Sequence, residues 1–313
     1  KRLHPENPYS NNNVSLVIDD ARSFIKNDKI YYDSIIYGLL DSQTNLSAKG
    51  GIRLDSYVFT LEAFKEAKER LTDNGFLCIS FFVQTPELGF KLFKMLEKTF
   101  GEKPLVFKSE TNDRYIFISR NNENKIFYDT KLNFFKLIND FDNYSYSVDL
   151  STDDWPFIYM PKKVYPLTYL TIITLLIFSS LIFINKIIKI KQKNFSFVCF
   201  FLGSGFMLVE TKCITEIAKI YGSTWLVTSI TIASILLMAF IANLMIIKKF
   251  KINIIQIYIF LFISLFVGYL FSKFGFDILG NETFNFLLPI ILTLPLLFSG
   301  LAFSKELSKL NSA

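Results

Sequence analysis

STDDWPFIYMPKKVYP, residues 151–166, separates two parts of the chain that differ in composition. Charged and apolar residues alternate before this stretch, whereas long uncharged apolar runs follow it. Asp153 and Asp154 precede an aromatic residue, Trp155, and prolines, lysines and a tyrosine come next. This punctuation is typical of a chain that enters the interface of a lipid bilayer. The stretch, which we call the junction, therefore predicts a border between a water-soluble α/β part and a membrane part.

The composition favours a membrane protein of about two domains. The chain has 313 residues, of which 51% are hydrophobic and 35 are Phe, and such a sequence is more apolar than an ordinary soluble protein. Its length leaves room for about two domains of about 100 to 200 residues each. Lysines in the short loops between apolar runs explain the net charge of +6, since membrane topology requires them. No basic stripe with interleaved aromatic residues lies outside these loops, so we exclude nucleic acid as a partner.

The three cysteines give no sign of a metal site. Cys78, Cys199 and Cys213 lack the spacing of metal ligands, and the last two lie in or near apolar runs. We expect all three to be free, buried thiols, and we predict no metal.

The first half of the chain alternates strand and helix patterns. Residues 14–18 predict a buried parallel strand, and an acidic turn at 19–22 caps the helix that follows. Further strands are expected at 34–37, 76–82, 105–108 and 115–119, with helices at 61–71 and 86–100. The alternation predicts a partial doubly wound sheet, and the short link between the last two strands predicts an antiparallel hairpin at its end.

Polar residues follow the first two predicted strands. Ligands in doubly wound sheets bind beyond the carboxyl ends of the strands. Asp19, Asp20, Gly38 and Asp41 lie at those positions. The sequence therefore predicts a ligand site there, although Asp19 and Asp20 would also serve simply as caps of the next helix.

Three segments carry a resemblance to a known family: VSLVIDDARSF (14–24), YDSIIYGLLDS (32–42) and FTLEAFKEAKERLTDNGFLCISF (59–81). Together they resemble the latter half of spermidine-synthase-like proteins, which have the class I S-adenosylmethionine-binding fold, over roughly residues 14–120. The resemblance implies S-adenosylmethionine or its decarboxylated form as cofactor. It also implies that the Asp20 carboxylate accepts the adenine amino group while the Ala21 amide meets a ring nitrogen.

The same resemblance shows where this chain departs from the family. Aminopropyl transferases carry an Asp that helps to deprotonate the attacking amine, and Gly38 stands at its position. Asp41 remains as a candidate general base, or as a solvated or helix-capping carboxylate. The glycine-rich loop that would hold the amino-acid end of the cofactor is not in this sequence. The resemblance thus implies that the chain is a fragment, that a segment of the same protein precedes Lys1, and that the chain alone binds the cofactor poorly.

Five apolar runs in the second half predict membrane-spanning helices, and hence a multi-pass cell membrane protein with the lipid bilayer as partner. The runs cover residues 167–184, 195–209, 225–247, 252–271 and 284–303. Residues 200–212, FFLGSGFMLVETK, are similar to a membrane segment of bacterial spermidine-synthase-like integral membrane proteins, which implies a prokaryotic source. Gly203 and Gly205 are expected to let neighbouring helices approach closely.

Glu210 and Lys212 are the candidate polar site inside the membrane. A carboxylate at that depth is costly, so we expect Glu210 to find Lys212, another helix, water or a proton. Glu210 would then bind a substrate, a lipid headgroup or a proton, or it would mark the water-facing end of a short span. If all five runs span, the lysine-rich loops share a side with the C-terminus, and the positive-inside rule places the α/β part opposite them, outside the cytoplasm. The cofactor implied by the resemblance is expected inside, so either one run is re-entrant or the domain does not use that cofactor, and the side of the α/β part stays open.

These patterns divide the chain at residues 1–120, 121–165, 166–304 and 305–313. They are the α/β part, an extension with a helical patch at 132–138 plus the junction, the membrane bundle, and a polar tail. Two functions are considered. The first, implied by the resemblance, is a membrane-bound transferase that moves an aminopropyl or methyl group from the cofactor to a small-molecule amine or a lipid-proximal acceptor. The alternative is a non-catalytic transporter or scaffold whose degenerate α/β domain binds a polyamine or a nucleoside.

Overall fold

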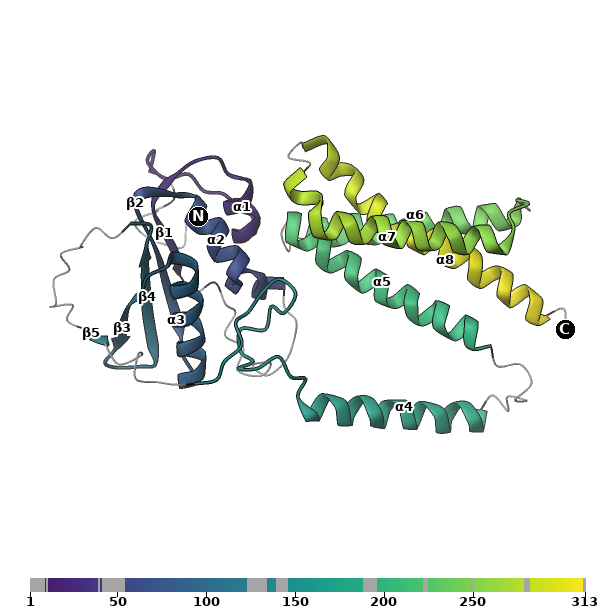
Figure 1. The fold of residues 1–313 in the computed structure, drawn as a ribbon, viewed down its shortest axis with the longest axis horizontal. Coiled ribbons are helices and arrows are strands. Elements are labelled where there is room, and N and C mark those ends of the chain that lie inside the picture. Colours follow the sequence, from purple (N-terminus) through teal and green to yellow (C-terminus); the bar gives the residue numbers. More distant parts are fainter. Residues whose placement is uncertain are drawn as a thin grey trace.

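The computed structural model of the chain describes residues 9, 11–38, 40, 54–122, 134–138, 146–187, 196–221, 225–248, 250–278 and 282–311. These residues form an α/β domain and a set of long helices, which the junction connects (Figure 1). The division expected from composition is therefore present in the fold.

The α/β domain is built on a mixed sheet of five described strands. These are β1 (Tyr32–Gly38), β2 (Leu71–Phe82), β3 (Leu105–Ser109), β4 (Arg114–Arg120) and β5 (Phe135–Ile138). Their order is β1-β2-β4-β3-β5, with β1 parallel to β2 and the other pairs antiparallel. The predicted antiparallel hairpin is thus confirmed as β3 and β4. The helical patch expected at 132–138 is wrong over its described part, because residues 135–138 extend the sheet by bonding to the edge of β3.

Residues 14–18 do not form the predicted strand. They are an exposed loop, in which the Leu16 side chain is 51% and the Ile18 side chain 93% exposed. A strand must pair its backbone groups, and the sheet begins at β1, whose one neighbour among the described strands is β2. The β-branched pattern alone therefore does not place these residues in the sheet.

Helices α1 (Ala21–Asn27), α2 (Leu61–Glu69) and α3 (Pro86–Phe100), together with the short 3-10 helix η2 (Leu54–Phe59), pack on one face of the sheet. On β1, Ile35 and Tyr37 point to this face and are buried, whereas Ile36 is 65% exposed. Caps limit two of these helices: the Thr60 side chain accepts the Ala63 amide, and Gly101 ends α3 with φ 85°. Phe64, Leu92 and Phe117 are fully buried between these helices and the sheet. The residue spacing thus determines which faces of α2 and α3 form the core.

The junction belongs to the core of the α/β domain. Its residue Ile158 is 2% exposed and packs in the same cluster as the sheet. The Lys91 ammonium on α3 donates to the carbonyls of Phe157 at 2.7 Å and Met160 at 2.8 Å. The Leu61 amide donates to the Ser151 carbonyl at 3.0 Å. The junction is therefore anchored to α2 and α3 before the chain continues into the membrane part.

The membrane part contains α4 (Leu167–Ile187), α5 (Phe197–Tyr221), α6 (Trp225–Ile247), α7 (Ile254–Ile278) and α8 (Glu282–Asn311). Among the described residues, four of these helices are long and apolar enough to cross a membrane, over Phe197–Ala218, Thr228–Ile247, Ile254–Lys273 and Leu287–Ser308. These four lie in four of the five runs predicted to span the membrane. In the fifth, α4, the apolar part found among the described residues is Leu167–Phe183, which at 1.5 Å per residue is shorter than a hydrocarbon layer of about 30 Å.

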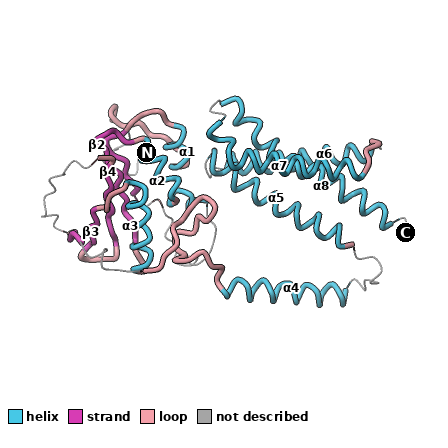
Figure 2. The backbone as a smooth tube through the Cα atoms, viewed as in Figure 1, coloured by secondary structure: helices cyan, strands magenta, loops and turns pink. Residues whose placement is uncertain are grey.

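Helix α8 is the centre of the bundle, because it packs against α5, α6 and α7 (Figure 2). A Cβ built on Gly300 would lie 3.4 Å from the Ala242 Cβ, so α6 and α8 approach closely there. The expectation for Gly203 and Gly205 is wrong, since a Cβ at either position meets nothing within 4 Å. Helix α4 stands apart from the bundle, and its described side chains are exposed.

Candidate functional site

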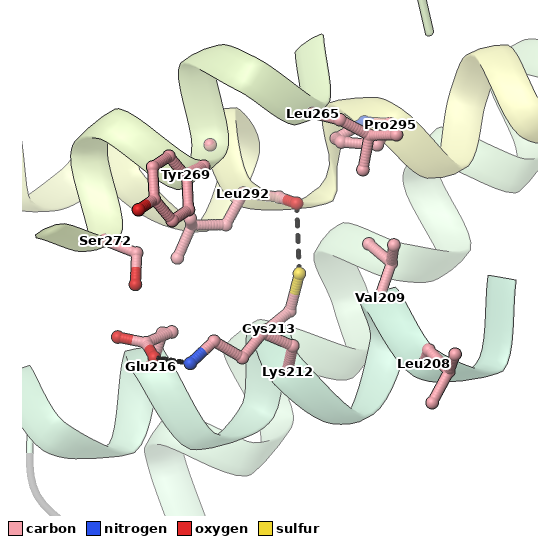
Figure 3. A pocket seen from close by; sticks show the side chains of 11 residues that line it. Leu208, Val209, Lys212, Cys213, Glu216, Leu265, Tyr269, Ser272, Leu292 and Pro295 are labelled. Atoms are coloured by element: carbon pink, nitrogen blue, oxygen red, sulfur yellow. Dashed lines mark hydrogen bonds and ion pairs between the residues drawn. The ribbon is translucent and has the colours of Figure 1, made fainter. Parts of the chain in front are cut away.

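A pocket of about 300 Å³ lies between α5, α7 and α8 in the membrane part (Figure 3). It is lined by Leu208, Val209, Lys212, Cys213, Glu216, Leu265, Gly268, Tyr269, Ser272, Leu292 and Pro295. Most of its wall is apolar, and its polar groups come from one face of α5 and from α7. A concave apolar pocket with few polar groups is the usual form of a small-molecule site.

Glu216 is the central polar residue of this pocket. Its side chain is only 3% exposed, whereas that of its partner Lys212 is 58% exposed, and the ammonium and carboxylate are 2.5 Å apart. The pair forms because residues four apart on a helix lie one above the other. The two charges therefore differ in freedom: the carboxylate is fixed in the protein, and the ammonium is on a flexible stem that reaches the surface.

The hydroxyl groups of Tyr269 and Ser272 on α7 lie on the same side of the pocket as the Glu216 carboxylate (Figure 3). On α5, one turn before Glu216, the Cys213 thiol donates to the Leu292 carbonyl at 3.0 Å and joins α5 to α8 (Figure 3). Pro295, one turn further along α8, has no amide hydrogen to continue the helical bonding. The pocket therefore lies between the part of α8 that contains Pro295 and the part of α5 that contains the Lys212–Glu216 pair.

The structure separates the two membrane residues selected from the sequence. Lys212 lines the pocket, but Glu210 does not, and the ion pair of Lys212 is with Glu216. The sequence analysis did not select Glu216 as a site residue. The signal that would have found it is the spacing of four between Lys212 and Glu216, which favours an ion pair on a helix.

The predicted cofactor residues have local roles in the structure. The Asp20 carboxylate accepts the amides of Arg22 at 3.1 Å and Ser23 at 3.0 Å, so it caps α1, and Ala21 is the first residue of that helix. The Asp19 carboxylate accepts the Asp20 amide at 2.8 Å. Helix capping, one of the two roles considered for this acidic turn, is therefore present.

The remaining predicted residues follow β1. Gly38 is its last residue and is exposed, and a Cβ added there would meet nothing within 4 Å. A larger side chain would therefore fit at this position without a clash. Asp41 lies outside the described residues.

Arg22, the last residue of the acidic turn at 19–22, is the centre of a buried ionic cluster. Arg22 is 4% exposed. Its guanidinium binds Glu66 at 2.9 and 3.1 Å and Asp153 of the junction at 2.7 and 2.8 Å, and it donates to the Tyr57 carbonyl at 3.2 Å. Burial alone would lower the pKa of Arg22, but the hydrogen bonds and charges of Asp153 and Glu66 raise it. We call Arg22, Glu66 and Asp153 the arginine cluster.

Helix α5 contacts the α/β domain close to the arginine cluster. It touches α1 and η2, the short helix that contains Tyr57. Burial raises the pKa of Tyr57 to about 12, and the negative charges of Glu216 and Asp153 add to this shift.

The cysteines are free in the described structure. Cys213 is buried as predicted, whereas Cys78 and Cys199 are only half-buried. Among the residues that the structure describes, no group of three His, Cys, Asp or Glu side chains could hold a metal ion.

Comparisons with protein-family models, with curated proteins and with solved structures found no match. The class of protein to which this chain belongs is therefore described from its fold and its pocket. This is a protein with a mixed α/β domain and four helices that are long and apolar enough to cross a membrane.

Proposed function

We propose that the chain is a membrane protein that binds, and transports, a small amine in the pocket between α5, α7 and α8. The ammonium group of the ligand binds Glu216, and its carbon chain lies along the apolar wall. Polyamines have this combination of groups. The α/β domain contacts the same end of α5 and regulates the site.

The observation that carries this proposal is the buried carboxylate of Glu216. A charge inside a membrane span is costly and is usually retained for function. Its partner ammonium on Lys212 is more than half exposed, while the carboxylate is 3% exposed. A group entering the pocket therefore meets the carboxylate at a fixed position.

The ion pair supplies a mechanism for reversible binding. Removing the cation from a buried carboxylate is strongly unfavourable, so Lys212 can leave Glu216 only when another cation replaces it. A ligand ammonium does so, and the hydroxyls of Tyr269 and Ser272 can accept its remaining hydrogens. The exchange keeps the pocket neutral at every step.

The test measures spermidine binding to the full chain in detergent by calorimetry, and spermidine flux in proteoliposomes. Glu216→Gln should weaken binding by about tenfold or more, since a hydrogen bond to a charged group is lost, and it should stop flux. Glu210→Gln is the matched control, because Glu210 is on the same helix but does not line the pocket. Equal losses in the two variants would contradict the proposal.

The Lys212→Gln variant tests whether the Lys212 ammonium exchanges with the ligand or helps to bind it. If Lys212 only balances Glu216, the variant has no internal competitor and should bind spermidine at least as tightly as the natural chain. A loss of binding as large as that of Glu216→Gln would contradict the exchange mechanism. Helix content from circular dichroism should be the same in all three proteins.

A second candidate function is the transferase implied by the resemblance. It is favoured by the parallel pair β1 and β2, the antiparallel hairpin that follows, and the position of Asp20 before α1. In this reading Asp20 holds the adenine of S-adenosylmethionine or its decarboxylated form, and the acceptor is an amine. Gly38 supplies no base, so Asp41 would have to assist the acceptor.

Two substitutions at Asp20 test this candidate. Asp20→Ala removes both the carboxylate and the cap, whereas Asp20→Asn keeps a good cap. A role in cofactor binding predicts that both variants weaken S-adenosylmethionine binding in calorimetry, by about 1 to 3 kcal/mol. Unchanged affinity in Asp20→Asn, with lower stability in Asp20→Ala alone, would leave Asp20 with a capping role only.

A further inference from the structure

A second pocket, of about 260 Å³, lies at the other end of the bundle from the α/β domain (Figure 1). It is formed where α6 ends, α7 begins and α8 ends. Its lining residues are Met245, Ile246, Phe250, Ile252, Ile257, Leu301, Ser304, Lys305 and Ser308. We call it the terminal pocket.

The terminal pocket has one polar wall and one apolar wall. Ser304, Lys305 and Ser308 come from the last turns of α8 and supply hydroxyl and ammonium donors. The apolar wall consists of side chains from α6 and α7, such as Met245 and Ile257. Such a pocket is suited to a ligand with a polar head and a hydrocarbon tail.

The Lys305 ammonium is held in place at this pocket. It donates a hydrogen bond to the Ile252 carbonyl, just before α7 begins. A lysine ammonium has three donors, so two can serve a bound acceptor.

The depth of the terminal pocket corresponds to the membrane surface. The apolar span of α6 ends at Ile247, that of α7 begins at Ile254, and that of α8 ends at Ser308. Each of these three span ends is a lining residue of the terminal pocket or lies within two residues of one. A ligand here has its head at the level of lipid headgroups and its tail at the level of the hydrocarbon.

The charge around the terminal pocket is positive. Lys248 and Lys251 are exposed and lie next to lining residues in the sequence. Glu306 adds one negative charge beside Lys305 but does not line the pocket. Three lysines against one glutamate favour an anionic head, and basic pockets at helix ends bind anionic lipid headgroups.

We infer that the terminal pocket binds an anionic phospholipid. The phosphate accepts hydrogen bonds from Lys305 and from the hydroxyls of Ser304 and Ser308, and an acyl chain lies against the apolar wall. Inorganic phosphate satisfies the polar wall alone and leaves the apolar wall exposed to water. The lipid, which covers both walls, is therefore the ligand that fits.

The test titrates the detergent-purified full chain with dioleoylphosphatidylglycerol and, separately, with dioleoylphosphatidylcholine, and counts bound lipid by native mass spectrometry. Phosphatidylglycerol should bind more tightly, and Lys305→Gln should weaken it about fivefold, the effect expected for one basic residue at a lipid headgroup. The matched control is Lys162→Gln, which removes an exposed lysine of the junction. Equal binding of the two lipids, or equal losses in the two variants, would overturn the inference.

Two further measurements separate the pocket from surface charge. Ser304→Leu fills the pocket without changing the net charge, and it should weaken phosphatidylglycerol binding while the Lys162→Gln variant binds normally. Competition by inorganic phosphate should be weak. If Ser304→Leu has no effect, or if inorganic phosphate displaces the lipid at equimolar concentration, the terminal pocket is not a lipid site. Thermal unfolding of each variant confirms that the bundle is intact.

Discussion

Arg22 shows how one residue connects three segments of the α/β domain. Its guanidinium bonds to Glu66 on α2, to Asp153 in the junction and to the Tyr57 carbonyl in η2. Arginine suits this position because its planar group forms two parallel bonds with each carboxylate. The Thr60 hydroxyl, which caps α2, also donates to Asp153 at 2.8 Å.

Removing this guanidinium should destabilise the α/β domain strongly. Arg22→Met leaves the carboxylates of Glu66 and Asp153 without their partner in a site where they are 20% and 24% exposed, and the loss of one partner from a buried pair costs about 3 to 5 kcal/mol. The measurement is urea unfolding of the full chain in detergent, followed by Trp155 fluorescence in a Trp225→Phe background.

Lys94→Gln is the control for the arginine cluster. The Lys94–Glu97 pair on α3 is exposed at its lysine, and such surface pairs contribute at most about 1 kcal/mol. If Arg22→Met and Lys94→Gln shift the unfolding midpoint by similar amounts, the arginine cluster does not hold the domain together.

Lys91 predicts a dependence of stability on pH. Burial lowers its pKa from the ordinary 10.5 to about 8, while Asp149 opposes and Lys163 adds to this shift. Between these values the unfolded chain keeps a proton that the folded chain has released, so stability should rise with pH across the window, by at most about 1.4 kcal/mol per pH unit. Below pH 8 the lysine is charged in both states, and its contribution is constant.

Comparison with Lys91→Met isolates this effect from other groups that titrate at high pH. The free energy of unfolding, measured from Trp155 fluorescence as before, should change in favour of the natural chain as the pH rises from 8 to 10.5. A difference between the two proteins that is independent of pH would show that Lys91 titrates normally.

At the scale of elements, local patterns predicted helices better than strands. The caps at Thr60 and Gly101 depend on a few neighbouring residues, and α2 and α3 formed as expected. A strand depends on a distant partner, so residues 14–18 and 135–138 were both assigned wrongly. The same limit applies to the site: the i, i+4 pair of Lys212 and Glu216 is local, but its burial by α7 and α8 depends on the tertiary fold.

Gly300 lies where α6 and α8 are closely packed. A Cβ added at this position would lie 3.4 Å from that of Ala242, so Gly300→Leu should force the helices apart and lower the free energy of unfolding by about 1 to 3 kcal/mol. Gly203→Leu is the matched control, because that glycine of α5 faces open space, and it should leave the melting temperature of the detergent-solubilised chain unchanged or higher. Equal melting temperatures for both variants would contradict the close approach.

At the scale of the whole molecule, the docking of the α/β domain determines the path of α4. The domain touches the end of α5 that carries Glu216, while the next helix after the junction, α4, leads to the opposite end of α5 (Figure 1). Helix α4 has 21 residues, about 31 Å in length, and therefore connects the two ends of the bundle. We predict that α4 also crosses the membrane although its apolar part is short, because hydrophobic mismatch of this size is tolerated at modest cost.

This path predicts that the α/β domain and the C-terminus lie on opposite sides of the membrane. Lys248, Lys251 and Lys305 mark the end that carries the C-terminus, so this end should be cytoplasmic. A green fluorescent protein fused after Ala313 should fluoresce in cells, and a phosphatase that is active only outside the cytoplasm should be active when inserted in the α/β domain. A fluorescent C-terminal fusion together with an inactive phosphatase would place both on the cytoplasmic side, and would mean that α4 does not cross the membrane. An α/β domain outside the cytoplasm would also be separated from cellular S-adenosylmethionine, which favours amine binding over group transfer as the function.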